Sequence, residues 1–258
     1  MEVHHSHHAT HKKDFKEYIL EFLMLFIAIS LGFFAENIRE HKVEKEREIK
    51  FLQNIHFDLR NDLVEIDKVI LANKKKQILG DSLLNAYADG TLLNRLPDFY
   101  VFVKAITLRK LLENSNNGFI QLKNAGGLRL IENKKVIHDI QEYENLISKI
   151  EKLESISETT FQNFRFKAAS ILDVTTSTEM NKVQIIGSID SIGFSRYKRP
   201  ENPKPLHIRD MDQINELLNL ASFALNTNTY ILRSINDLKQ KAIELDENIL
   251  KEYGDKFD

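Results

Sequence analysis

The sequence predicts an all-α protein in which an N-terminal transmembrane helix continues into an antiparallel bundle of long helices with a coiled-coil-like C-terminal helix. Three observations predict this fold. Glycine and proline are scarce, with 9 and 4 among 258 residues, as expected of long helices that need few tight turns. One apolar segment lies near the N-terminus, and apolar residues then recur three and four apart over most of the chain.

Residues 1–17 are predicted to form a disordered, histidine-rich tail. The first residues, MEVHHSHHATHKK, have no apolar periodicity. Neutral imidazoles this close together can share a transition metal ion. The imidazoles belong to His4, His5, His7, His8 and His11. We expect a solvated polar tail without a metal or any other cofactor.

Residues 18–38 are predicted to form the transmembrane anchor. From Tyr18 to Ala35 the segment YILEFLMLFIAISLGFFA is apolar except for Glu21 and Ser30. As a helix it spans about 27 Å, which is just enough to cross a bilayer.

Two other interpretations of the anchor segment compete with a membrane span. A buried core helix competes because the charge-free stretch Phe22 to Ala35 is short. Apolar residues on every side and abruptly charged flanks favour the membrane. A cleaved signal peptide is disfavoured, because a cut after Ala35 would put Phe33 where a small residue is needed.

Residues 39–258 are predicted to form a helical bundle domain that starts as a solvated extension of the anchor helix. From Phe51 the helix becomes amphipathic, and a break is expected at Gly80 and again at 88–90. A second helix is expected near Asp98 to Glu113, closed by 114–118. The apolar face of the first helix consists of Leu52, Ile55, Leu59, Leu63, Ile66, Val69 and Ile70.

A third, long helix is predicted from about Asn133 to Leu172, with apolar residues along one side. Residues 175–206 are expected to form an irregular loop, because serine, threonine, glycine, asparagine and proline replace the periodic pattern. Within this loop the segment VQIIGSI allows at most one short strand.

The C-terminal helix has the most regular pattern, with apolar residues alternating three and four apart through about five heptads. This seam packs either against the chain's own helices, the interpretation we favour, or against a second copy. Asn228 lies in the seam, where an amide sets register or oligomeric state in either case. The seam consists of Ile214, Leu217, Ala221, Ala224, Asn228, Ile231, Ile235, Leu238, Ala242, Leu245 and Ile249.

Two stretches of the sequence contain distinctive motifs. In the first, a short apolar helix ends in an Ala-Glu-Asn-x-x-Glu-His-like motif. The matching residues are Ala35, Glu36, Asn37, Glu40 and His41. In the second, a Leu-x-x-x-Gly-Gly-Leu-x-x-Ile element is matched by Leu122, Gly126, Gly127, Leu128 and Ile131. With these motifs the chain resembles a family of uncharacterised bacterial single-pass membrane proteins. The resemblance implies a membrane anchor and a helical domain, and it supplies no reaction, ligand or partner.

The glycine pair also has a physical interpretation that does not depend on the resemblance. Gly126 and Gly127 end one short helix before the next begins near Asn133. Glycine permits a positive φ at such a joint, so we expect the pair to serve packing there.

Two arguments about orientation oppose each other. The flank after the anchor carries more lysine and arginine than the tail before it, which favours a cytoplasmic C-terminal domain. Five glutamates are interleaved in that flank, and long domains are exported largely regardless of charge. We expect a single-pass protein of a bacterial inner membrane with a periplasmic C-terminal domain.

No residue cluster in the sequence amounts to a catalytic or cofactor site. Cysteine is absent, which excludes disulfides, thiolate zinc sites and cysteine nucleophiles. None of the four histidines after the N-terminal tail follows a glutamate by three residues, as a di-iron bundle requires. Zincin, Walker-type and Gly-x-Ser-x-Gly motifs are also absent. We therefore expect no enzyme.

A few residues remain as candidates for chemistry. Glu21 is an ionisable group inside the anchor, and Ala28 and Gly32 are small residues that allow two anchors to approach closely. His41 with Glu44, and His138 with Glu142, share helix faces and are expected to be solvated pairs. An enzyme would need His138, Glu142 and Arg129 to converge in a cleft.

These observations predict a membrane-anchored helical interaction or scaffold protein. Its expected partners are the lipid bilayer, through residues 18–38, and a second protein or a second copy of the chain. A net charge of -2 provides no basic field for nucleic acid. The alternative is a helical sensory domain that binds a small molecule at the membrane surface.

Overall fold

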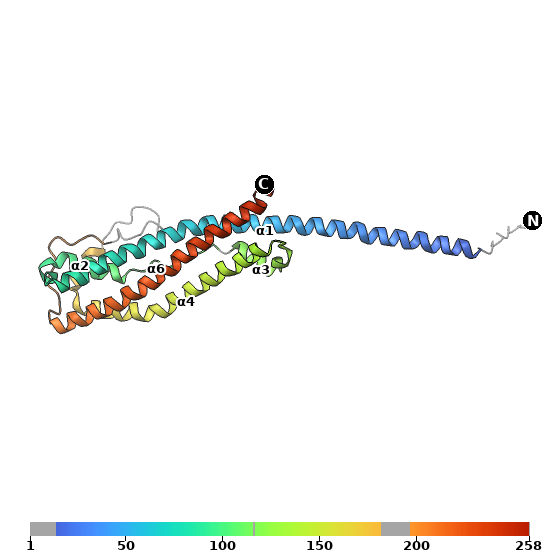
Figure 1. The fold of residues 1–258 in the computed structure, drawn as a ribbon. Helices are drawn as coiled ribbons and strands as arrows, with labels where there is room; N and C mark the ends of the chain where they lie inside the picture. Colours follow the sequence, from blue (N-terminus) through green and yellow to red (C-terminus); the bar gives the residue numbers. More distant parts are fainter. Residues whose placement is uncertain (1–13, 116, 182–196, 258) are drawn as a thin grey trace, which may run out of the picture.

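The computed structural model describes residues 14–115, 117–181 and 197–257, and this part of the chain is all-α. Three long helices form its body: α1 (Phe15–Ala88), α4 (Lys134–Ile171) and α6 (Met211–Tyr253). The shorter helices are α2 (Leu96–Thr107), α3 (Asn117–Asn124) and α5 (Val174–Asn181), with 3₁₀ turns η1 (Leu92–Arg95), η2 (Gly127–Leu130) and η5 (Gly254–Lys256). Figure 1 shows that the N-terminal part of α1 extends far beyond the bundle.

The long helices α1 and α4 run in the same direction, and α6 returns antiparallel to both. Near the start of the bundle, Glu48 Oε1 on α1 accepts hydrogen bonds from the Tyr253 hydroxyl (2.7 Å) and from the Glu132 backbone N–H (2.9 Å), just before α4. Farther along α1, Gly80 lies against the side chain of Leu225, in the first half of α6. Tyr253 is the last residue of α6, so the two helices run in opposite directions.

Helices α1 and α4 can be parallel because the segment between α2 and α3 carries the chain back along the bundle. This return segment, residues 108–115, has no regular secondary structure. Lys110 lies 3.4 Å from the Glu65 carboxylate on α1, and the backbone N–H of Ser115 donates to Asp62. The second contact satisfies a backbone N–H that has no helical partner in this segment.

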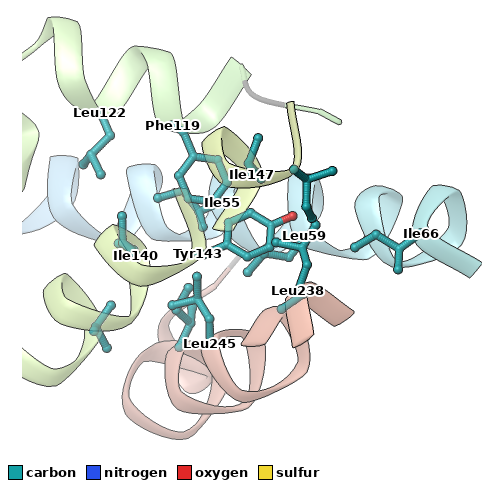
Figure 2. Close-up of a cluster of buried hydrophobic side chains, with 14 of the residues drawn as sticks. Ile55, Leu59, Ile66, Phe119, Leu122, Ile140, Tyr143, Ile147, Leu238 and Leu245 are labelled. Atoms are coloured by element: carbon teal, nitrogen blue, oxygen red, sulfur yellow. The ribbon is translucent and has the colours of Figure 1, made fainter. Parts of the chain in front are cut away.

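The apolar stripe of α1 positions the other long helices around a continuous core. Leu52, Ile55 and Leu59, three and four residues apart, have no exposed surface. Figure 2 shows side chains from α1, α3, α4 and α6 meeting in this cluster. The rings of Phe119 and Tyr143 stack with centroids 5.4 Å apart. A second cluster fills the other end of the bundle, beneath α2.

The predictions for α4 and α6 are confirmed. The side chain of Asn133 caps α4 by accepting from Lys135 N and Val136 N, and Asp210 caps α6. Every residue of the predicted seam is buried, because α6 packs against α1 and α4. The seam is therefore used within the chain.

The predicted break at Gly80 is wrong, because α1 continues through this residue to Ala88. The break predicted at 88–90 is confirmed, because α1 ends there, before Asp89-Gly90. A Cβ on Gly80 would lie 2.3 Å from Leu225 Cδ2. The glycine thus serves close helix packing rather than a turn.

The second helix was also mispredicted. It spans Leu96–Thr107 and ends before Glu113, because residues 108–115 extend along α1 and α4. Residues 117–118, expected to close it, begin α3 instead. Part of the predicted irregular loop is helical, since α5 covers Val174–Asn181. Residues 1–13 of the predicted histidine-rich tail and the VQIIGSI segment lie outside the described residues. The predicted end of the tail at residue 17 is wrong, because α1 begins at Phe15 and Asp14 caps it.

Candidate functional site

The first part of α1 is exposed on every side. All side chains from 14 to 42 are exposed, and none of the apolar window is buried in the protein. Within the described ranges, α1 is the one helix long and apolar enough to cross a membrane. Burial in the chain's own core, the competing interpretation of the anchor, does not occur.

A cleft of about 460 Å³ lies where α1 enters the bundle. Its position is close to the predicted anchor, because Glu48 is the first buried residue of α1 and follows Ala35 by about 20 Å of helix. Most of the lining side chains are charged. The whole lining consists of Glu40, His41, Glu44, Lys45, Glu48, Arg129, Leu130 and Glu132.

The floor of this cleft is a buried carboxylate with several partners. Lys45 Nζ lies 2.7 Å from Glu48 Oε2 and 2.9 Å from Glu132 Oε2. Burial raises the pKa of Glu48, but Lys45, the Tyr253 hydroxyl and a backbone N–H outweigh burial and hold that pKa below its ordinary value. Burial and the nearby Glu48 carboxylate raise the pKa of Tyr253 to about 12.

This network joins three parts of the chain at one point. Glu48 belongs to α1, Tyr253 ends α6, and Glu132 lies between η2 and α4. Because Glu48 is ionised and hydrogen-bonded, the network fixes the helices at the level where α1 leaves the bundle. Among the described residues, no group of three or more metal-ligating side chains could hold a metal ion.

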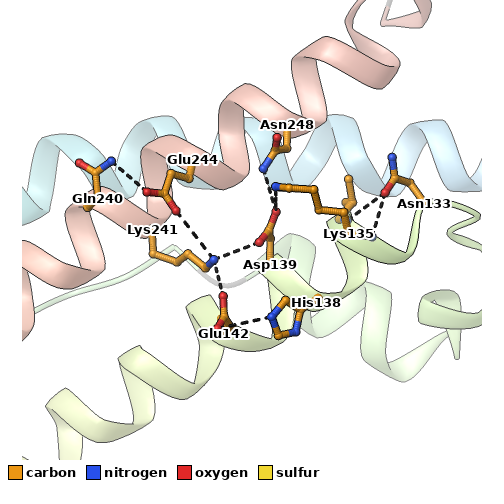
Figure 3. Close-up of polar contacts among 10 residues, drawn as sticks. Asn133, Lys135, His138, Asp139, Glu142, Gln240, Lys241, Glu244 and Asn248 are labelled. Atoms are coloured by element: carbon orange, nitrogen blue, oxygen red, sulfur yellow. Dashed lines mark hydrogen bonds and ion pairs between the residues drawn. The ribbon is translucent and has the colours of Figure 1, made fainter.

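A second polar cluster joins α4 to α6 (Figure 3). Asp139 accepts hydrogen bonds from Lys135 (2.9 Å), Lys241 (3.0 Å) and Asn248 (2.8 Å). Burial raises the pKa of Asp139, but the two lysines outweigh this effect and hold it below its ordinary value. Lys241 also pairs with Glu142. The arrangement is a clasp between helices in which the buried carboxylate is fully partnered.

Asp62 is a buried carboxyl group in the middle of the bundle. It accepts a hydrogen bond from the Tyr143 hydroxyl at 2.6 Å and another from the Ser115 backbone. Burial raises its pKa to about 6, although both donors act in the opposite direction. Asp62 thus holds the return segment and α4 against α1.

Lys76 lies two heptads farther along the same side of α1 and is also buried. Its ammonium lies 4.6 Å from the centre of the Phe161 ring, and within the described ranges no carboxylate is at ion-pair distance. Burial lowers the pKa of Lys76 to about 7, and the nearby guanidiniums of Arg109 and Arg165 lower it further. Those guanidiniums share the carboxylate of Glu158.

The outer face of α1 carries a row of exposed apolar residues, which we name the outer stripe. It consists of Phe57, Val64, Leu71 and Ile78, each seven residues from the next. Their exposed fractions are 54, 57, 57 and 65 %. They lie on the side of α1 opposite the buried stripe, so none of them contributes to the core.

The structure separates the residues that an enzyme would have needed together. His138 Nε2 lies 3.5 Å from Glu142 Oε1 on the exposed side of the α4–α6 clasp. Arg129 lines the anchor-proximal cleft instead, together with His41 and Glu44. Glu21 lies on the exposed part of α1.

Asn228 and the glycine pair have structural roles. The Asn228 amide donates to the backbone oxygen of Asn73 (3.0 Å) and to the Gln77 side chain (3.2 Å), so it sets the register of α6 on α1. Gly126 has a φ of +61°. A Cβ on Gly127 would crowd the side chains of Leu122 and Phe51. The expectation of a packed joint is confirmed.

Three buried charged residues, Glu48, Asp62 and Lys76, were not found by sequence reasoning. A signal was present, because each occupies a position of the buried stripe of α1. Asp62, for example, lies three residues after Leu59 and four before Ile66. A charge at such a position indicates either a partnered polar group or an unusual pKa.

The chain matches no protein-family model, no curated protein and no solved structure.

Proposed function

We propose that the chain is a membrane-anchored helical interaction or scaffold protein that holds its bundle at a bilayer surface. The observation that carries the proposal is the continuity of α1. One helix runs from Phe15 to Ala88, exposed and apolar in its first part and buried along one face in its second. The same element is thus both the anchor and the central helix of the bundle.

The energetics support a bilayer around the first part of α1. Large apolar side chains from Phe15 to Ile38 are exposed, some by as much as 75 %. Contiguous apolar surface of this extent marks a site of membrane or protein contact. Burial in hydrocarbon gains about 25 cal/mol per Å² of apolar surface. The helix also satisfies its own backbone hydrogen bonds, as a spanning segment must.

The absence of a flexible joint within α1 gives the proposal a mechanical consequence. A helix transmits rotation and tilt, whereas a flexible linker does not. The bundle is therefore presented at a fixed height and in a fixed orientation to anything else in the same membrane. Such an arrangement suits a protein that receives or positions a partner beside it.

We propose that the membrane is a bacterial inner membrane and that the bundle faces the periplasm. The long domain after the anchor supports export, because such domains are translocated largely regardless of flanking charge. An epitope fused after Asp258 tests the orientation. Proteolysis of the epitope in intact spheroplasts supports the proposal, and protection until lysis places the bundle in the cytoplasm.

Membrane attachment is tested by comparing the full chain with a variant that lacks residues 18–38. We expect the full chain to stay in membranes washed with alkaline carbonate and the variant to be released. Equal release of both would contradict the anchor.

The interaction role is tested with a photoreactive amino acid placed at exposed apolar positions in cells. We expect discrete protein adducts from Phe166 or Phe223, which are 73 and 65 % exposed. A matched polar position, Lys152, should give none. A chain that forms no protein adduct from any exposed apolar position would contradict an interaction role.

A small-molecule sensor would need an apolar pocket with a few convergent polar groups. The cleft between α4 and α6, of about 500 Å³, is lined by charged and amide side chains except for Leu146. The interaction proposal is therefore preferred over the sensory alternative.

A further inference from the structure

We propose that the outer stripe of α1 is the contact surface between two copies of this chain, arranged in parallel around a two-fold axis along the membrane normal. This inference rests on the proposed function, because the bilayer is what aligns the two copies. The partner of the anchored bundle is then a second copy of the chain, and the outer stripe is the surface that binds it.

The spacing of the stripe is the first argument. Four apolar side chains recur every seven residues from Phe57 to Ile78, and each is more than half exposed. A seven-residue repeat is the repeat of a helix that packs along another helix. Among the exposed large apolar residues on α6, only Phe223 and Tyr230 show the same spacing, and they form a single step.

The identity of the partner follows from the orientation that a membrane imposes. Two copies inserted in one bilayer point in the same direction, so their α1 helices can meet only in parallel. Around a two-fold axis along the membrane normal, each residue of α1 then lies at the same height as the identical residue of the other copy. Val64 meets Val64 and Leu71 meets Leu71, so the stripe is apolar against apolar at all four levels.

Residues beside the stripe do not oppose this pairing as a uniform wall of like charge. The two flanks meet across the two-fold axis, where opposite charges come together at one level, Asp67 beside Lys68 of the other copy, and like charges at the next, Lys74 beside Lys75. One flank carries Arg60, Asp67, Lys74 and Asp81; the other carries Asn61, Lys68, Lys75 and Ser82.

The stripe is continuous with a close-approach position in the anchor. Val64 follows Ala28 by 36 residues in one uninterrupted helix, which is ten turns at about 3.6 residues per turn. Ala28 therefore faces the same direction as Val64, and Gly32 follows it one turn later. Small residues four apart let two membrane helices approach closely. The small pair alone would not indicate a dimer, but it extends the contact line that the stripe defines.

Cysteine chemistry gives a direct test, because the chain contains no cysteine. Val64→Cys and Leu71→Cys are made singly in the full chain, and isolated membranes are treated with a short bismaleimide. The matched control is Tyr230→Cys on α6, at a residue that is exposed by 68 % and lies off the stripe. All three substitutions are on the surface and leave the core unchanged.

We expect a covalent dimer of twice the 30.0 kDa chain from the two stripe variants and at least tenfold less from Tyr230→Cys. Adding Leu71→Glu to Val64→Cys should abolish the dimer, because it places two carboxylates in apposition at the next level of the stripe. Equal crosslinking of the control would show random collision and overturn the proposal.

The test separates this inference from the proposed function. A chain that stays in carbonate-washed membranes but remains monomeric at positions 64 and 71 overturns the two-fold pairing only. If those positions crosslink instead to a different protein, the pairing is also wrong and the interaction role survives. Release of the chain from the membrane would contradict the proposed function itself.

Discussion

The two halves of α1 belong to one helix but place their apolar side chains in opposite environments. Leu25, in the first half, is 62 % exposed and has exposed apolar neighbours all round the helix. Leu59, in the second half, has no exposed surface and belongs to a single buried stripe. The amount of apolar surface therefore does not decide where a helix lies. Its distribution decides this, because a helix apolar all round needs an apolar medium and a striped helix needs a partner on one side.

The largest effect should come from matched substitutions in the two halves. Leu59→Ala leaves a cavity between α1, α4 and α6, and we expect it to lower the free energy of unfolding by about 2–5 kcal/mol. Leu25→Ala removes the same atoms from a side chain that touches no part of the bundle, so unfolding should not change. Denaturant titration of both variants in the same detergent measures the difference. Similar losses in both variants would mean that the first half of α1 is packed against the bundle.

A charge in the buried half should show the next largest effect. Lys76→Met replaces a buried ammonium that faces the ring of Phe161 with an apolar side chain of similar length. Because no charge is then buried, we expect the free energy of unfolding to rise by about 1–4 kcal/mol at pH 6. The exposed Lys75, changed to Met in the same way, is the control and should have little effect.

The sign of the pH dependence at Lys76 follows from its two pKa values. The pKa of this lysine is about 7 in the folded chain and 10.5 as its ordinary value. Between these values the unfolded chain binds more protons, so folding becomes more favourable as the pH rises. The advantage of Lys76→Met should therefore be greatest below pH 7 and disappear towards pH 10.5. An advantage that is constant from pH 6 to pH 10 would show that Lys76 is not neutralised by folding.

Long, capped helices were predictable from the sequence because their signals are local. The asparagine before α4 and the aspartate before α6 cap those helices, and the apolar period continues between caps. The short α5 also had a local signal, since Asp173 accepts from the backbone N–H of Thr176. The prediction of an irregular loop rested on the serine- and threonine-rich composition alone.

The return segment and the buried charges depend on contacts that are distant in sequence. The extended path of residues 108–115 depends on acceptors such as Asp62, about fifty residues earlier. A periodic pattern cannot show that a tyrosine on α4 will reach this carboxylate, nor that no carboxylate of the described residues will lie at ion-pair distance from Lys76. The outer stripe was visible in the sequence as a seven-residue repeat, but its exposure depends on where α4 and α6 pack.

Two glycines of α1 make a third test of the comparison. Gly80→Ala forces a Cβ to within 2.3 Å of Leu225 Cδ2, and we expect α6 to shift and stability to fall by about 1–3 kcal/mol. Gly32→Ala places its Cβ where no atom lies within 4 Å. Thermal unfolding of the bundle should be unchanged in that variant. If Gly80→Ala were instead stabilising, the helix propensity of alanine would outweigh the contact and α6 would lie farther from α1 than described.

The smallest effect concerns the hydrogen bond from the Tyr143 hydroxyl to the buried carboxyl group of Asp62 on α1. Tyr143→Phe removes the hydroxyl 2.6 Å from Asp62 and leaves the Ser115 backbone as a donor. We expect a loss of about 1 kcal/mol at pH 8, where Asp62 is ionised. The exposed Tyr230→Phe should cause no loss.

The dependence of that loss on pH identifies the charged form as the partner of Tyr143. Folding raises the pKa of Asp62 from 3.8 to about 6, so this group contributes stability below pH 3.8 that is lost as the pH rises through 6. Because the hydroxyl favours the ionised carboxylate, its removal should raise the pKa of Asp62 further and extend the loss to higher pH. Unfolding measured at pH 4 and pH 8 should therefore show the larger difference between wild type and variant at pH 8. An equal difference at both values would mean that the hydroxyl stabilises the neutral and the ionised carboxyl group of Asp62 to the same extent.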